Sequence, residues 1–533
     1  MFESIEHWQV NKKAVFSREG VVAAQHTVAE QAGASILASG GNAVDAAVAT
    51  AFALGCVEPW MCGLGGSGYM VVWDARAASA RVYDFQGVLP GSISTEDYPL
   101  DAIVPESIMG FPGVVNDLNT VGYRSIAVPG AVKGLTTALA RDGRLGLDTV
   151  LKPAIALAEK GLEGNWFTTL QIALATRYLQ QDAAAKACYL PEGVPPQPEQ
   201  RLYLDPLGST LRCIADQGPD VFYRGVLSEK MVADLQAGGS KIDQQDFADY
   251  RVIESESLQG LHRGVQLHTA GPTSGGPRLI ETLAHIEASL SLTEQPGPNS
   301  WQVYAAGLNK AWRSHNARIG RATEVGGCTS HLSCVDSDGN MVALTYTLLS
   351  RFGSCVVLPQ TGILMNNSVS YFDPRPGYPT SMAGNKRINA SNMCPTIATR
   401  DNESLFALGA SGANFIMPCT TQVAALMLDF NLTLEHAINH PRLDVSEHGT
   451  VRADPRLGDA VIEQLGKTHA VERAQLLVYP KLYACPSGVS RNPDSGELFG
   501  ANDPSQPVGG AVSVEMVRHL ERQEQSGGNE LNR

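Results

Sequence analysis

Two threonines, Thr329 and Thr347, are the residues of this chain whose types and spacing best suit catalysis. Each lies in a segment with the period-two alternation of a β-strand, and a turn at 336–340 joins the two segments. If Val335 pairs with Met341, Thr329 stands opposite Thr347 and the two hydroxyls meet on one face. Two facing threonines are also an ordinary cross-strand pair, so the hairpin alone does not establish a catalytic site.

The chemistry that Thr329 could perform depends on where the chain is cut. A threonine in mid-chain is a poor nucleophile because no base stands beside it. Cleavage of the peptide bond before Thr329 would free its α-amine, and that amine could then act as the base. Thr347 could hydrogen-bond the hydroxyl. The sequence around this hairpin must therefore show whether such a cleavage is expected.

Length and charge limit the classes of partner. The chain has 533 residues, of which 44% are apolar and 18% charged, so it can bury a large core. Its net charge of −14 argues against nucleic acid or an anionic membrane as partner. The first residues lack a basic segment followed by an apolar one, and the longest apolar tract, 43–57, is too short to span a bilayer. We therefore expect a cytoplasmic protein with no signal peptide.

The cysteines and glycines do not predict a metal or a cofactor. Ten cysteines are scattered without a CxxC pair or zinc-like spacing to histidine. The glycine-rich stretch 62–68 precedes a strand-like segment at 69–73, whereas a dinucleotide-binding loop follows a strand. We expect neither a bound metal nor a cofactor.

Alternating helical and strand-like segments predict a layered α/β protein that positions the hairpin. The chain becomes rich in strands from Thr329 onward, and the residues from about 516, rich in Glu, Gln and Gly, suggest a disordered tail. Helices are expected at 27–39, 43–55, several places within 131–240, 273–289, 420–430 and 432–439.

Short motifs along the chain favour the catalytic interpretation of the hairpin. Their order resembles that of the γ-glutamyltransferase family over nearly the whole chain, to about residue 515. Before the hairpin the motifs are Gly41-Asn42-Ala43-Val44-Asp45, Val57-Glu58-Pro59, Gly63-Leu64-Gly65-Gly66, Val128-Pro129-Gly130, Phe222-Tyr223-Arg224-Gly225 and Thr273-Ser274-Gly275-Gly276. From the hairpin onward they are Thr329-Ser330-His331, Asp338-Gly339-Asn340, Thr345-Tyr346-Thr347, Phe352-Gly353-Ser354, Met393-Cys394-Pro395-Thr396 and Asp503-Pro504.

This resemblance implies a fold and a processing step. The fold is the four-layer αββα architecture of N-terminal-nucleophile hydrolases. By resemblance the precursor cleaves itself between Cys328 and Thr329, giving a large subunit, 1–328, and a small subunit, 329–533. Together these would form one domain, a heterodimer that could pair into a dimer of heterodimers.

The resemblance also implies roles for single residues. Thr329 would be the nucleophile both in self-cleavage and in attack on the substrate, and Thr347 would hold and polarise its hydroxyl. Gly412 and Ala413 align with the paired backbone N–H donors of the oxyanion hole. The family usually has two glycines there, so Ala413 departs from the pattern.

The residues that would bind a γ-glutamyl group are changed. Gln86 stands where the family has its carboxylate-binding arginine, and Tyr371 lies where the ammonium-binding acid is expected. Leu349 replaces an asparagine, and the serine pair falls at Ser391 and Asn392. Since a hydrogen bond to a charged group contributes roughly 1.5–3 kcal/mol, these losses would weaken γ-glutamyl binding by orders of magnitude.

Intact machinery without the glutamyl-binding residues favours a smaller acyl group. Within the family the chain most resembles the oxamate amidohydrolase branch, which implies hydrolysis of oxamate to oxalate and ammonia in purine nitrogen catabolism. Ser391, Asn392, Arg351 and Arg124 are candidates for binding a substrate carboxylate, with Gln86 and Tyr371 nearby in the aligned motifs. The alternatives are a glutathione hydrolase or γ-glutamyltransferase, an acylase for another amide, and an inactive scaffold protein.

Overall fold

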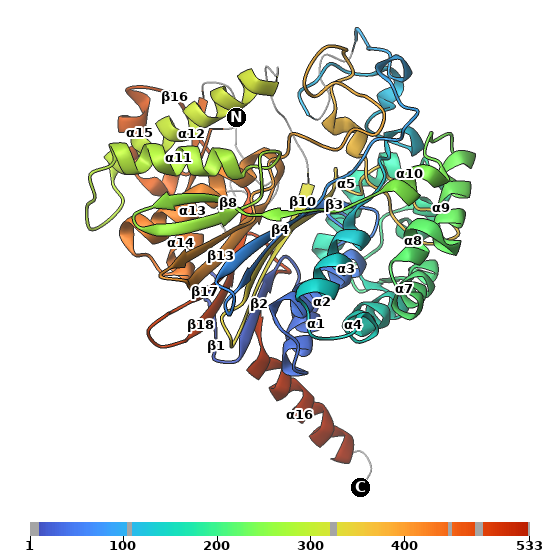
Figure 1. The fold of residues 1–533 in the computed structure, drawn as a ribbon, viewed down its shortest axis with the longest axis horizontal. Coiled ribbons are helices and arrows are strands. Elements are labelled where there is room, and N and C mark those ends of the chain that lie inside the picture. The colour runs from blue at the N-terminus through green and yellow to red at the C-terminus, as the bar shows by residue number, and fades with distance from the viewer. Residues whose placement is uncertain (1–9, 104–108, 320–327, 446–449, 475–482, 531–533) are drawn as a thin grey trace.

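Two seven-stranded sheets stacked face to face form the centre of the protein (Figure 1). The computed structural model describes residues 10–103, 109–319, 328–445, 450–474 and 483–530, with the backbone alone for 524–530. Helices cover the outer face of each sheet. The result is the four-layer αββα architecture expected from the sequence, which is thereby confirmed.

The sheet that contains Thr329 is here called the nucleophile sheet. Its central strands are antiparallel, and β10 lies between β2 and β11. In spatial order its strands are β19 (Gly510–Ser513), β2 (Gly20–Ala24), β10 (Cys328–Asp336), β11 (Met341–Leu349), β3 (Ser67–Asp74), β4 (Ser79–Phe85) and β7 (Ile253–Glu256).

The second sheet packs against the nucleophile sheet. The loop after its strand β13 (Glu403–Ser411) reaches the pocket at Thr329. The strands of this second sheet are also antiparallel. In spatial order they are β1 (Val15–Ser17), β18 (Leu498–Asn502), β17 (Cys485–Arg491), β13 (Glu403–Ser411), β12 (Thr396–Arg400), β9 (Val265–Thr269) and β8 (Leu258–His262).

Ten helices pack on the outer face of the nucleophile sheet. Helix α2 is the most buried, with no exposed residue, and Asn42 and Asp45 form a capping box at its start. These helices are α1 (Thr27–Ala38), α2 (Ala43–Val57), α3 (Ala131–Asp142), α4 (Leu147–Lys160), α5 (Trp166–Leu179), α6 (Ala183–Tyr189), α7 (Asp205–Gln217), α8 (Asp220–Arg224), α9 (Val226–Ala237) and α10 (Gln244–Asp249).

Helices from the later part of the chain cover the second sheet. They are α11 (Gly276–Ser289), α12 (Pro298–Ile319), α13 (Ile416–Phe430) and α14 (Leu434–Asn439). Beside them lie α15 (Asp459–Gly466) and a small sheet of β14 (Leu443–Asp444), β15 (Thr450–Ala453) and β16 (Ala470–Arg473). A further two-stranded sheet, β5 (Leu162–Glu163) and β6 (Arg201–Leu202), lies among the helices α1 to α10.

The period-two alternation of the strands explains how the sheets pack. Alternate side chains of β10 and β11, such as Val335 and Met341, face the second sheet and contact Ile397 and Ala407 from it in one apolar layer. The intervening side chains, such as Leu332, face the helices. The two sheets are therefore held by apolar burial on both faces of the nucleophile sheet.

Both sheets contain strands from before and after the Cys328–Thr329 bond, and strands of the two kinds pair with each other. In the nucleophile sheet, β10 pairs with β2, and β11 pairs with β3. In the second sheet, β12 pairs with β9. A cut at this bond would leave both fragments held by shared ladders and one common core.

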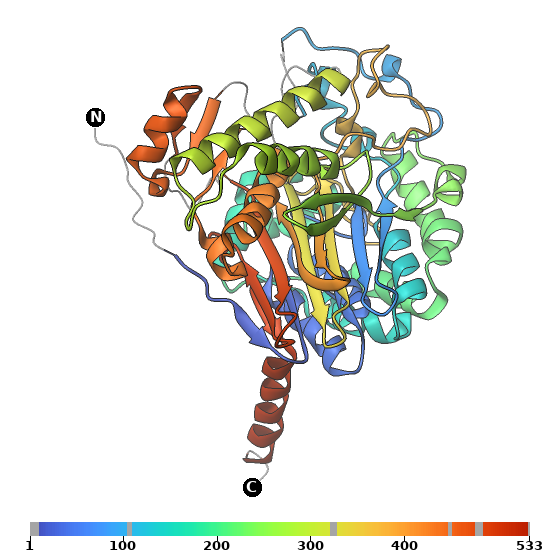
Figure 2. The ribbon, with the colours of Figure 1, turned by 60° about the vertical axis from the view of Figure 1, so that its left-hand side comes forward.

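The end of the chain differs from the expected disordered tail. Residues Val514–Glu530 form helix α16, which extends away from the body (Figure 2). Val514 and Val517 are buried, and the Glu515 carboxylate accepts hydrogen bonds from the Ser17 hydroxyl and the Arg18 N–H at 2.7 and 2.9 Å. Because Glu, Gln and Arg are good helix formers, a polar composition here did not mean disorder. No helix among the described residues is long and apolar enough to cross a membrane.

Candidate active site

A β-bulge places Thr329 in the nucleophile sheet. The expected register holds from the Val335–Met341 pair to the Ser330–Tyr346 pair and then shifts, so that Cys328 pairs with Leu349. Between these two pairs β11 has two residues, Thr347 and Leu348, where β10 has only Thr329, so the bulge lies on β11 and Thr329 is not simply paired with Thr347 as expected. Bulges bend a strand and redirect a side chain, and they are common beside active sites.

The Thr347 hydroxyl contacts the peptide bond that would be cut. It donates a hydrogen bond to the carbonyl oxygen of Cys328, and it accepts one from the N–H of Leu349 at 2.8 Å. The N–H of Leu349 can only donate, so it directs the Thr347 proton toward Cys328. In the uncut chain, Thr347 therefore polarises the carbonyl before Thr329; its contact with the Thr329 hydroxyl in the cleaved enzyme stays a prediction.

Thr329 lies at the wall of a small pocket between the two sheets. Its side chain is buried, and the pocket has about 10 Å³ of free space in the uncut chain, close to what one water molecule needs. The other residues that line it are Met109, Leu349, Tyr371, Asn392, Met393, Ala413, Asn414 and Ile416. No lining residue among those described carries a charge at neutral pH.

The turn after β13, formed by Gly412 and Ala413, reaches this pocket at Ala413. Gly412 has φ 135° and Ala413 has φ 52°, so the chain turns sharply at the point where Ala413 meets the pocket. Within the described residues, neither N–H donates a hydrogen bond to another protein group. Two such N–H groups beside Thr329 suit a developing oxyanion.

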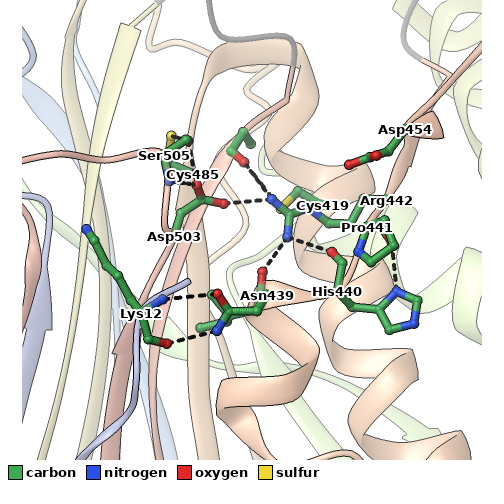
Figure 3. Close-up of polar contacts among 12 residues, drawn as sticks. Lys12, Cys419, Asn439, His440, Pro441, Arg442, Asp454, Cys485, Asp503 and Ser505 are labelled. Carbon is green, nitrogen blue, oxygen red and sulfur yellow. Dashed lines mark hydrogen bonds and ion pairs between the residues drawn. The ribbon is translucent and has the colours of Figure 1, made fainter. Parts of the chain in front are cut away.

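A buried ion pair between Arg442 and Asp503, drawn in Figure 3, is connected to this turn through Ala484. Arg442 donates to the Asp503 carboxylate at 2.7 Å and to the carbonyl of Ala484 at 3.5 Å. Ala484 packs so closely under Gly412 that a Cβ on this glycine would come 2.8 Å from the Ala484 Cα. The Asp503-Pro504 motif thus helps to fix the position of the Gly412–Ala413 turn.

A polar contact also fixes the strand on the opposite side of the nucleophile. The Ser330 hydroxyl donates to the buried Glu58 carboxylate at 2.8 Å, and the Gln506 amide donates to the same carboxylate at 3.3 Å. Glu58 follows α2 directly, so the Val57-Glu58-Pro59 motif ties the end of this helix to the residue after Thr329.

His331, two residues beyond Thr329, is a packed residue of the strand. Its ring nitrogens contact the hydroxyls of Thr345 and Ser333 at 2.8 and 3.0 Å, and burial lowers its pKa to about 3. A neutral ring with both nitrogens occupied is structural. The base must be another group.

Three of the altered specificity positions occupy the space around the pocket. Tyr371 and Leu349 line it directly, and Leu349 has φ 82°, a conformation that is rare for a leucine. Gln86 is fully buried one layer away, where its amide contacts the Met393 sulfur at 3.5 Å. Of the serine-pair positions, Asn392 lines the pocket, and Ser391 donates its backbone N–H to Thr273 at 2.9 Å.

The two arginines expected to bind a carboxylate lie elsewhere. The guanidinium of Arg351 donates to the Gln171 side chain on α5 at 2.7 Å. Arg124 donates to the carbonyl of Asp97 at 2.7 Å and stacks on the ring of Tyr98. Neither belongs to the described lining of the pocket, because contacts with residues of the 1–328 segment hold both side chains elsewhere.

Sequence reasoning missed Arg278 and Asn414. Asn414 lines the pocket next to Ala413, and Arg278 stands behind the lining residue Asn392, to which it donates at 2.7 Å. Arg278 follows the Thr273-Ser274-Gly275-Gly276 motif by two residues, but nothing in the sequence indicates that this part of the chain folds against 391–392. No cluster of three or more potential metal-binding side chains occurs in the described parts of the chain.

Comparison with known proteins assigns the family. The family profile described as Gamma-glutamyltranspeptidase matches residues 29–311 and 302–513. The chain belongs to this family. The Acylase ACY 1 proenzyme of Pseudomonas sp. (strain SE83) is 33% identical over 531 residues, covering 92% of this chain and 93% of the relative. The Glutathione hydrolase proenzyme of Escherichia coli (strain K12) is 29% identical over 543 residues, covering 92% and 91%.

Solved structures show the same fold. The cephalosporin acylase from Bacillus halodurans aligns with a TM-score of 0.84 at 23% identity, covering 96% of this chain and 99% of that one. As a member of the gamma-glutamyltranspeptidase family, with proenzymes among its relatives, the protein is an amidohydrolase of the self-processing type.

Proposed function

We propose that the mature enzyme hydrolyses the amide of a short acyl group, with oxamate as substrate and oxalate and ammonia as products. The observation that carries this proposal is the pocket at Thr329, which has room for about one water molecule and is closed by Leu349 and Tyr371. A γ-glutamyl group would need more space and two ionic partners. The two-carbon acyl group of oxamate also needs more room than one water molecule, but far less than a γ-glutamyl group, and it carries only one ionic group.

Self-cleavage comes first in this mechanism. The Thr329 hydroxyl attacks the Cys328 carbonyl carbon, and the Thr347 hydroxyl stabilises the negative charge that develops on the carbonyl oxygen. The C–N bond breaks, the Thr329 nitrogen takes a proton, and an ester links Cys328 to the Thr329 oxygen. Water then hydrolyses this ester, leaving a Cys328 carboxylate and a free Thr329 amine.

Turnover reuses the same hydroxyl. The Thr329 amine accepts the hydroxyl proton while the oxygen attacks the amide carbon of the substrate. The N–H groups of Gly412 and Ala413 face the oxyanion, and ammonia leaves with the proton returned by the amine. Water, activated by that amine, releases the second product and restores Thr329.

A second candidate is an acylase that accepts a larger, apolar acyl group. Met109, Leu349 and Ile416 give the pocket an apolar side. The similarity to the Acylase ACY 1 proenzyme supports this candidate as well. Cleavage of the chain would have to widen the pocket before such a group could enter.

Two measurements test the proposal. On a denaturing gel, wild type should resolve into two fragments that meet at the Cys328–Thr329 bond, and Thr329→Ala should stay in one piece. Ammonia release should then be faster from oxamate than from a γ-glutamyl anilide or a long-chain acyl amide. Faster turnover of the long-chain amide would favour the acylase, and activity on the anilide alone would refute both candidates. A cytoplasmic location, proposed with oxamate as substrate, is tested by cell fractionation.

A further inference from the structure

A buried arginine stands behind the polar wall of the pocket. Arg278 is 2% exposed, and one of its terminal nitrogens donates to the carbonyl oxygen of Ser391 at 2.8 Å and to the Asn392 side-chain oxygen at 2.7 Å. Its guanidinium lies over the Trp312 ring, 4.6 Å from the ring centre. Contacts from α12 and from 391–392 therefore fix the plane of this cation.

Arg278 is favourably placed for these contacts but unfavourably placed for the stability of its own helix, α11. It is the third residue of α11, and a positive charge in the first turn of a helix is unfavourable for the helix dipole. A charged group is also costly to bury unless it is paired or hydrogen-bonded. The contacts with Asn392 and Ser391 are the ones that connect it to the active site.

Arg278 determines which way the neighbouring amides point. A guanidinium has donors only, so the Asn392 atom that it contacts must be the amide oxygen. The Asn392 nitrogen must then be the atom that donates to the Asn414 side-chain oxygen at 2.8 Å. This leaves the Asn414 nitrogen as a donor, and Asn414 lines the pocket beside Ala413.

The relay from Arg278 through Asn392 to Asn414 therefore presents N–H groups to the pocket. A charged donor at the start of such a chain also polarises each following hydrogen bond. The rest of the described lining, apart from Thr329 and Tyr371, consists of apolar side chains and Ala413. The wall is suited to an acyl group that carries a hydrogen-bond acceptor or a negative charge, although no charged residue touches the pocket.

We propose that Arg278 is a specificity-determining residue, which orients the amides of Asn392 and Asn414 so that the pocket selects a carboxylate next to the scissile amide. This inference rests on the proposed function, because it names the residue through which a short anionic acyl group is recognised. Arg278 acts through Asn392 and is a positioning residue.

The test compares oxamate with pyruvamide, in which a neutral acetyl group of similar size replaces the carboxylate. Wild type should favour oxamate. Arg278→Met should lower kcat/KM for oxamate at least tenfold, mostly through KM, and change kcat/KM for pyruvamide less than threefold. Arg212→Met, which removes an exposed arginine paired with Glu159, should leave both values unchanged.

A second variant keeps the proposal testable if Arg278→Met does not fold. Asn414→Asp keeps an oxygen for Asn392 but places a carboxylate where we infer a donor. It should lower oxamate turnover at least a hundredfold and pyruvamide turnover much less. Self-cleavage on a gel reports whether each variant has folded around Thr329. An equal loss for both substrates would overturn the inference, because it would mean that these residues only support the fold.

Inhibition by oxalate separates this inference from the proposed function. Oxalate should inhibit whatever amidase activity the wild type has, and Arg278→Met should raise its inhibition constant at least tenfold. If wild type cleaves other amides but not oxamate, the proposed function fails, while oxalate inhibition that depends on Arg278 would still support the inference. If oxalate does not inhibit wild type, or inhibits the variant equally, the inference fails.

Discussion

Replacing Thr347 by valine should nearly stop self-cleavage while leaving the shape of the strand unchanged. Valine has the size of threonine but cannot donate to the Cys328 carbonyl, the contact that polarises the bond to be cut. Loss of one oxyanion donor typically costs about 2.7–4 kcal/mol, which slows the reaction roughly a hundred- to a thousandfold. The buried N–H of Leu349 would also lose its acceptor, which costs about 1–3 kcal/mol of folding stability.

The assay follows the intact chain on a denaturing gel after synthesis in a cell-free system. Thr347→Val should remain uncut for at least a hundred times the wild-type half-time, and its melting transition should show that it is folded. Thr347→Ser keeps the hydroxyl and should cleave within tenfold of the wild-type rate. If the folded valine variant cleaves as fast as wild type, the hydroxyl does not stabilise the oxyanion, and the mechanism proposed for processing is wrong.

Three further predictions test the surroundings of the site. Glu30 is fully buried, which raises its pKa from 4.5 to about 8; its carboxyl lies near Lys12 and Glu58 and accepts backbone N–H groups. The native state thus holds a proton that the unfolded chain loses, so the free energy of unfolding should fall by a few kcal/mol between pH 4.5 and 8. Glu30→Gln should flatten this slope in urea titrations, and an unchanged slope would refute the assignment. Ala413→Gly should keep kcat within about threefold, because only the N–H is needed; a large loss would mean that the methyl group contributes. Asp503→Asn should lower stability by about 3–5 kcal/mol in urea unfolding, because Arg442 would keep a buried charge without its partner; a smaller loss would show that other groups balance the charge.

The hairpin at the site could be predicted because its pattern is local. Period-two alternation and the turn at 336–340 fix the two strands, and the register holds up to the Ser330–Tyr346 pair. The shift that follows was not predictable, since a bulge depends on what the strand meets in three dimensions. In the uncut chain the Thr347 hydroxyl contacts the carbonyl before Thr329, a contact that the sequence did not predict.

The residues around the substrate pocket were hard to predict because contacts between distant parts of the chain bring them together. Arg278 and Asn392 are 114 residues apart in the chain and meet only because α11 and the loop before β12 pack together. Arg124 and Arg351 lie close to motifs in the sequence, yet their side chains point to other partners. The 125–128 segment looks like a strand, but the structure has only an isolated bridge there, between Val88 and Val128.

Two residues with positive φ show how the site could change its specificity while keeping its backbone. Leu349 and Ala413 line the pocket from opposite sheets with φ of 82° and 52°. At the aligned positions the family pattern has asparagine and glycine, the residue types that adopt such angles most easily. A leucine or alanine held there costs on the order of 1–3 kcal/mol and persists only if the surrounding structure enforces it. The backbone path is the part that both positions keep, since it directs the Leu349 N–H to Thr347 and brings Ala413 to the pocket. The side chains were free to change, and the apolar side chains of Leu349 and Ala413 now form part of the pocket wall.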